Sequence, residues 1–77
     1  MTKRLNLTNE SKMIMELYQE RVIAEKHDLD IKKGALVAFM HEDIYPTLSA
    51  VEQGLFMVQL MAMTNYSDAL QRRIELF

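Results

Sequence analysis

The chain has 77 residues, with no cysteine, one proline, two glycines and a formal net charge of −2. This length suits one domain rather than two, and the lack of cysteine excludes disulfides and thiolate metal sites. The mildly acidic balance lacks the broad basic surface that binding a DNA or RNA polymer requires. Hydrophobic residues make up 49% of the chain. Because so small a domain buries a limited core, we expect copies of the chain to associate.

Residues 1–8 are expected to form a tail, and a first helix is expected over residues 9–40. Its side chains recur at steps of three or four, which is typical of one helical face. That face consists of Ile14, Tyr18, Val22, Glu25, Leu29, Lys33, Leu36 and Met40. Because glycine weakens a helix, we expect a kink or a close contact near Gly34.

A loop over residues 41–49 should end the first helix. Pro46 has no N–H to donate and pushes Tyr45 out of the helical region. Ser49 and Glu52 have the spacing of a capping box, which predicts a second helix over residues 50–76. The prediction is an all-α fold, an antiparallel two-helix hairpin in a single domain.

The second helix carries the strongest physical signal in the sequence. Between Gly54 and Met63, only Gln59 is clearly polar. A helix that is apolar all round has to be enclosed, and the other half of a hairpin covers one side alone. We therefore expect a homo-oligomer. The alternative, a monomer with a methionine-rich surface, would expose an aggregation-prone patch.

Membrane and secretion signals are not found in the sequence. No stretch approaches the 18 uninterrupted apolar residues of a membrane-spanning helix. The charged N-terminus is not followed by the apolar run of a secretion signal. We expect a protein of the cytoplasm without a membrane partner.

The sequence does not predict an enzyme, a cofactor or a metal site. His27 and His41 are separated by about 21 Å along a continuous helix, so they cannot share a metal ion. His41, Glu42 and Asp43 form either a metal-binding patch or a solvated loop, and the loop is the favoured reading. The isolated glycines form no phosphate-binding loop. No His and Asp stand at a readable triad spacing from the serines Ser11, Ser49 and Ser67.

Binding of a compact anion is better supported. The ring of Tyr18 can stack on a nucleobase, and the ammonium of Lys33 can neutralise a phosphate. Both lie on one broad face of the first helix, but they are about 22 Å apart along it. Antiparallel packing of two first helices across a two-fold axis would bring Tyr18 of one chain near Lys33 of the other. The alternative is that Tyr18 is a half-buried core residue and Lys33 a surface cation.

The spacing of residues 14–74 resembles a family of small phage proteins, the anti-CBASS sponges. In the first helix the similar residues are Tyr18-Gln-Glu-Arg-Val22, Glu25-Lys26, Leu29, Lys33, Leu36 and Phe39. In the second half they are Leu48, Glu52-Gln53, Leu55, Gln59-Leu60, Ala62-Met63, Tyr66, Leu70 and Arg73-Ile74.

The resemblance implies a helical hexamer that sequesters cyclic oligonucleotide messengers, such as cGAMP, of bacterial antiphage signalling. In that family an aromatic ring stacks on the base and a lysine meets the phosphates, roles that would fall here on Tyr18 and Lys33. Val37, one turn beyond Lys33, would form an apolar wall. Some members also hold cyclic trinucleotides through an arginine near the C-terminus, for which Arg72 and Arg73 are the candidates.

The expected function is therefore sequestration of cyclic dinucleotides between protomers, without catalysis, as a phage counter-defence. One alternative is a helical oligomer that binds a host or phage protein through its apolar second helix. A transcription antagonist is disfavoured because the chain has no basic recognition helix. The preferred nucleotide and the presence of a trinucleotide site are left open by the sequence.

Overall fold

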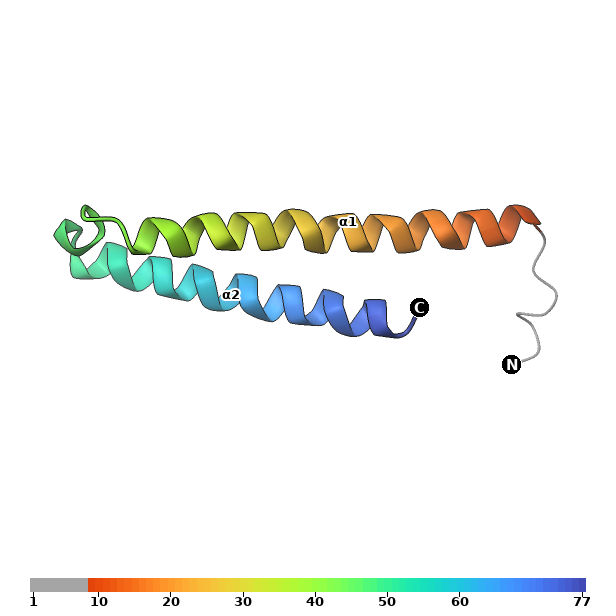
Figure 1. Cartoon of the computed structure of the whole chain (residues 1–77). Helices are drawn as coiled ribbons and strands as arrows, with labels where there is room; N and C mark the ends of the chain where they lie inside the picture. The colour runs from red at the N-terminus through yellow and green to blue at the C-terminus, as the bar shows by residue number, and fades with distance from the viewer. Residues whose placement is uncertain (1–8) are drawn as a thin grey trace.

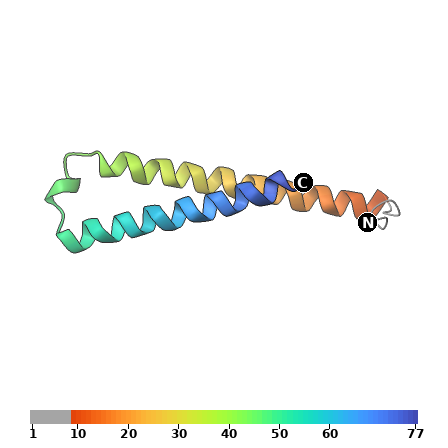
Figure 2. The ribbon, with the colours of Figure 1, turned by 90° about the horizontal axis from the view of Figure 1, so that it is seen from below.

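The computed structural model describes residues 9–77, so the tail expected over residues 1–8 lies outside the described part. It contains helix α1 (Asn9–Met40), a short 3-10 helix η2 (Tyr45–Thr47) and helix α2 (Ala50–Glu75). The two long helices lie side by side and run in opposite directions (Figures 1 and 2). The predicted all-α hairpin is confirmed. It is a rod with extents of 60 × 18 × 14 Å.

The turn between the helices is built as the local sequence predicts. Pro46 lies in the first turn of η2, where its missing N–H costs nothing. The Ser49 hydroxyl accepts a hydrogen bond from the Glu52 backbone N–H at 3.1 Å. In return, the Ser49 backbone N–H donates to Glu52 Oε1 at 3.1 Å. The predicted capping box is therefore present, and α2 begins immediately after it.

Three aromatic rings hold the turn against the helices. The ring centroids of Phe39 and Phe56 are 5.2 Å apart, and Tyr45 lies 5.9 Å from Phe56 and 6.2 Å from Phe39. The Tyr45 hydroxyl also donates to the backbone carbonyl of Gln53 at 3.1 Å. These contacts connect α1, η2 and α2, and they set the register between the two long helices.

The core is a single seam between the helices. Only Val22, Leu36 and Leu70 are buried apolar residues in the part of the chain that the structure describes. The seam follows alternating steps of three and four, the spacing of coiled-coil packing. Its residues are Val22, Lys26, Leu29, Lys33, Leu36 and Met40 of α1, and Phe56, Leu60, Met63, Ser67, Leu70 and Ile74 of α2.

Three residues of the predicted face of the first helix are exposed in the hairpin, namely Ile14, Tyr18 and Glu25. Glu25 is exposed, and Lys26 takes the seam position beside it, because the register places the next residue toward α2. Ile14 is also exposed. The first turns of α1 extend past the C-terminal end of α2, so nothing in the hairpin covers them (Figure 1).

The kink or close contact expected at Gly34 is absent. Helix α1 continues through Gly34, and its ribbon shows no kink there (Figure 1). A Cβ built on Gly34 would have no neighbour within 4 Å among the described atoms. The physical reason is that a glycine lowers helix stability without interrupting the backbone hydrogen bonds, which is what a kink requires.

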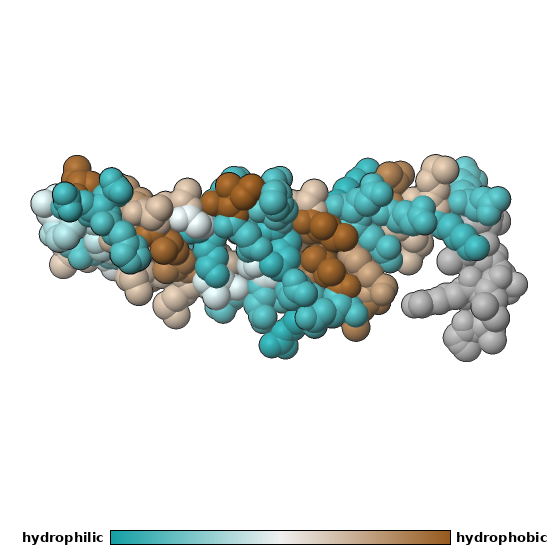
Figure 3. All heavy atoms as spheres, in the orientation of Figure 1, coloured by the Kyte–Doolittle hydropathy of each residue, from teal (hydrophilic) through white to brown (hydrophobic). Residues whose placement is uncertain are grey.

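The side of α2 that faces away from α1 is apolar and uncovered within the single chain. Its large exposed side chains are Val51, Leu55, Val58 and Met61. Hydrophobic side chains reach the surface at several places along the rod (Figure 3). Across residues 9–77, neither helix combines the length and apolar character needed to cross a membrane.

Candidate functional site

An open pocket lies halfway along the rod, where α1 faces the C-terminal half of α2. Its volume is about 460 Å³, and its lining residues are Lys26, Asp30, Lys33, Gly34 and Val37 of α1 and Ser67 of α2. Two of the residues that the sequence predicts for ligand binding, Lys33 and Val37, therefore line one pocket.

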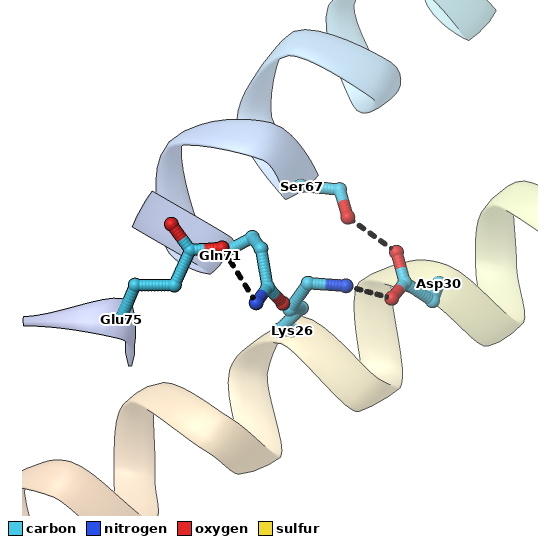
Figure 4. A network of polar contacts seen from close by, with 5 residues as sticks. All are labelled: Lys26, Asp30, Ser67, Gln71 and Glu75. Carbon is cyan, nitrogen blue, oxygen red and sulfur yellow. Dashed lines mark hydrogen bonds and ion pairs between the residues drawn. The ribbon is translucent and has the colours of Figure 1, made fainter. Parts of the chain in front are cut away.

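A polar network forms one side of this pocket (Figure 4). Lys26 Nζ donates to Asp30 Oδ2 at 2.6 Å, and Ser67 Oγ donates to Asp30 Oδ1 at 2.5 Å. The second bond joins α1 to α2 through the buried hydroxyl of Ser67. Asp30 therefore accepts one hydrogen bond on each carboxylate oxygen, while its side chain keeps 40% of its surface exposed.

The charge balance of the pocket is positive. The hydrogen bond from Lys26 lowers the pKa of Asp30, and the bond from Ser67 lowers it further. Asp30 is thus a carboxylate at neutral pH, and it neutralises one of the two lysines that line the pocket. Lys33 adds an attraction to Asp30 but makes no ion pair within 4 Å among residues 9–77. Its ammonium is therefore available to an anion.

Tyr18 lies elsewhere, at the open end of the hairpin. Arg73 Nη2 donates a hydrogen bond to the Tyr18 hydroxyl, and the guanidinium carbon lies 5.6 Å from the ring centroid. The ring of Phe77 packs against Tyr18 with centroids 6.2 Å apart. Beyond them, Tyr18 lines a separate depression of about 360 Å³ with residues that precede and follow it in α1 (Ile14, Leu17 and Arg21).

Tyr18 and Lys33 do not meet within one chain. Both lie on the uninterrupted helix α1, 15 residues apart, so the rise of the helix separates them by about 22 Å. A ligand as small as a cyclic dinucleotide cannot touch both in the single hairpin. The shared site that the sequence suggests therefore requires a second copy of the chain.

The two candidate arginines have different surroundings. Arg72 Nε donates to Asp68 Oδ2 at 3.1 Å in an exposed pair one helical turn apart. Arg73 reaches across to Tyr18 on the other helix. Of the two arginines, therefore, only Arg73 is hydrogen-bonded to Tyr18, which is itself a predicted ligand-binding residue.

His41 follows the last residue of α1 and contacts the end of that helix. His41 Nδ1 lies 2.9 Å from the carbonyl oxygen of Val37, so this ring closes the end of α1. No group of three acidic or histidine side chains that could hold a metal ion is present within residues 9–77.

Comparison with known proteins places the chain in a family. The family model described as Sequestin matches residues 16–76. The chain belongs to the Sequestin family. It is 40% identical over 63 residues to a 7.5 kDa protein of Enterobacteria phage T4 named after the denB-rIIB intergenic region, covering 82% of this chain and 98% of the relative. No solved structure matches the chain.

The match confirms the resemblance to the phage sponge family. The Sequestin model covers both helices and the turn between them, and it includes every residue that the sequence assigns to ligand binding. Helix α1 begins before the matched region, so its first turns lie outside the family pattern.

The pocket contains three residues that sequence reasoning missed as site residues, namely Lys26, Asp30 and Ser67. A signal for two of them was present, because Lys26 and Ser67, like Lys33, are polar residues in a largely apolar three–four repeat. Asp30 gave no such signal, since its role depends on facing Ser67 across the hairpin. Gly34 was noticed only as a weak point of the helix, and the structure shows that it borders the pocket.

Proposed function

We propose that this protein sequesters cyclic dinucleotides between its protomers and holds them unchanged, so that a host receptor is deprived of its messenger. The observation that carries the proposal is the pocket in which Lys33, free of ion pairs within residues 9–77, lies beside the apolar side chain of Val37. The Sequestin family, whose name denotes sequestering, and the phage T4 relative support it.

The chemistry of the pocket matches a phosphate-bearing ligand. The ammonium of Lys33, which makes no ion pair within 4 Å among residues 9–77, can attract a phosphate, and each charge-assisted contact contributes about 1.5–3 kcal/mol. A cyclic dinucleotide has two phosphates and two bases with approximate two-fold symmetry. Two protomers related by a two-fold axis would offer two Lys33 ammoniums, two Val37 side chains and two Tyr18 rings, one for each half of the ligand.

Assembly of several copies is part of the proposal. The outer face of α2 exposes Val51, Leu55, Val58 and Met61, and burial of such a face is a strong driving force for association. The family resemblance implies six subunits acting in the cytoplasm of the host cell. Arg73, or Arg72, would serve a second site for cyclic trinucleotides.

The test is titration of the purified protein with 3′3′-cGAMP by isothermal calorimetry and thermal melting. Ligand that binds the folded state raises the melting midpoint. Lys33→Ala should abolish binding, whereas Lys32→Ala, which changes a neighbouring lysine outside the pocket, should bind like the parent. Likewise, Tyr18→Ala should lose binding and Tyr66→Ala should keep it.

Two outcomes would overturn the proposal. If no cyclic nucleotide changes the melting midpoint, the alternative of a protein-binding oligomer that uses the apolar face of α2 takes its place. If the ligand released after heat denaturation has been hydrolysed, as shown by chromatography, the protein acts on the messenger and does not store it.

A further inference from the structure

The carboxylate of Asp30 lies on the wall of the pocket and is oriented in advance to accept hydrogen bonds. Lys26 and Ser67 hold it from two sides, on α1 and α2 respectively, so its orientation is set before any ligand arrives. A carboxylate has about four lone-pair positions, and these two bonds use one on each oxygen. Since 40% of the side-chain surface is exposed, the remaining positions are open to the pocket.

Gly34 leaves this carboxylate uncovered. In an α-helix the side chain of a residue points toward the N-terminus and covers the preceding turn. A side chain at position 34 would therefore lie over Asp30, which is four residues earlier. Only a side chain longer than a methyl group could provide that cover, because a Cβ there would meet no described atom within 4 Å, and the glycine leaves the space open. The opening leads to Lys33 and Val37 in the same pocket.

An acceptor of this kind selects its partner by hydrogen-bond chemistry. A carboxylate can only accept, so the ligand group that faces it must donate. The Watson–Crick edge of guanine presents two adjacent donors, N1–H and the N2 amino group. Adenine presents one donor, at N6, beside the N1 acceptor, whose lone pair a carboxylate repels.

We propose that Asp30 reads the guanine edge of a bound cyclic dinucleotide and makes the pocket prefer guanine-containing ligands over cyclic di-AMP. The inference rests on the proposed function, because Lys33 must hold the phosphate that brings the base to the carboxylate. Lys26 offsets the charge of Asp30, so this acceptor does not repel the phosphates.

The experiment compares cyclic di-GMP and cyclic di-AMP by isothermal calorimetry, with the parent and with Asp30→Asn. The parent should bind cyclic di-GMP more tightly. Asp30→Asn should lower the affinity for cyclic di-GMP by about tenfold or more, since a hydrogen bond to a charged acceptor is lost. Binding of cyclic di-AMP should hold or improve, because an amide can both donate to and accept from adenine.

Two control variants separate recognition from packing. Ser67→Ala removes one of the bonds that orient Asp30 but keeps the carboxylate, so it should lower the preference for guanine less than Asp30→Asn does. Asp28→Asn removes a carboxylate two residues away, outside the pocket, and should bind both ligands like the parent.

The results distinguish this inference from the proposed function. If the parent binds both ligands and Asp30→Asn leaves the ratio of their affinities unchanged, Asp30 does not select guanine, and the proposed function of sequestration is retained. If Ser67→Ala abolishes the preference as fully as Asp30→Asn, Asp30 acts through packing and the inference fails. If the parent binds neither ligand nor cGAMP, both proposals fail.

Discussion

The guanidinium of Arg73 lies over the ring of Tyr18, 5.6 Å from its centroid, and donates to its hydroxyl. This contact joins the end of α2 to α1, 55 residues earlier in the chain. It also holds, by its hydroxyl group, the ring that we propose to stack on a base. The stability of the open end of the hairpin and the position of this ring therefore depend on the same arginine.

Removing Arg73 should weaken both properties. Arg73→Ala loses a cation–π contact worth about 0.5–1 kcal/mol, so the free energy of unfolding should fall by roughly that amount. A less ordered Tyr18 should also lower the affinity for cGAMP several-fold. Arg72→Ala is the matched control, because it removes only an exposed pair with Asp68. Equal effects of the two variants, measured by melting and calorimetry, would contradict this role of Arg73.

Gly34 should be a site where stability and binding change in opposite directions. Gly34→Ala should raise the free energy of unfolding by about 0.5–1 kcal/mol, because alanine favours the helix and its Cβ has open space. It should weaken cyclic dinucleotide binding, since Gly34 lines the pocket and the methyl group would occupy space that the ligand needs. Gly54→Ala offers the same gain in helix propensity on α2, outside the pocket. Unchanged binding by Gly34→Ala would show that the opening is not used.

Acid should destabilise the hairpin partly through Asp30. Its pKa is lowered in the folded state, first by Lys26 and then by Ser67, so the folded state releases this proton more readily than the unfolded chain. The resulting stabilisation is present above the unfolded pKa, which is about 4, and is lost as the pH falls through the folded pKa. The melting midpoints of the parent and Asp30→Asn should differ at pH 7 and approach each other as the pH falls below about 4. Parallel curves over this range would exclude Asp30 as the cause.

Leu70 should be essential to the thin core. Its side chain is 1% exposed, and Leu70→Ala should cost about 2–5 kcal/mol, a large share of what so small a domain has. Leu76→Ala is a matched control at a position that is 86% exposed, where the same truncation should change stability little. Circular dichroism during thermal unfolding measures both. Similar losses would mean that Leu76 is covered in the assembled protein.

The apolar outer face of α2 should control assembly. Val58 is 62% exposed in the single hairpin, and Val58→Asp would place a charge inside any interface formed there. We expect the association constant to fall by at least about tenfold in sedimentation analysis. Ile44→Asp changes an apolar residue of similar exposure in the turn and should leave assembly intact. If the protein still assembles with Val58→Asp but not with Ile44→Asp, the interface lies at the turn and not on the outer face of α2.

The hairpin could be predicted because it follows from local rules. Pro46 ends one helix, the Ser49–Glu52 capping box begins the next, and both features are readable within a few residues. The pocket could not be predicted in the same way. Ser67 meets Asp30 across 37 residues of sequence, and that pairing depends on the register set by the aromatic turn. Tyr18 and Arg73 were each singled out as candidates by residue type and position, but their contact with one another across the hairpin was not predicted.

The Ser67–Asp30 bond also forbids the hairpin from slipping. A repeat with steps of three and four would tolerate a shift of seven residues, since apolar side chains would again meet apolar side chains. Such a shift would replace Ser67 by Leu60 or Ile74, and the carboxylate of Asp30 would face a hydrocarbon with no donor. This polar contact between α1 and α2 therefore favours a single register of the hairpin.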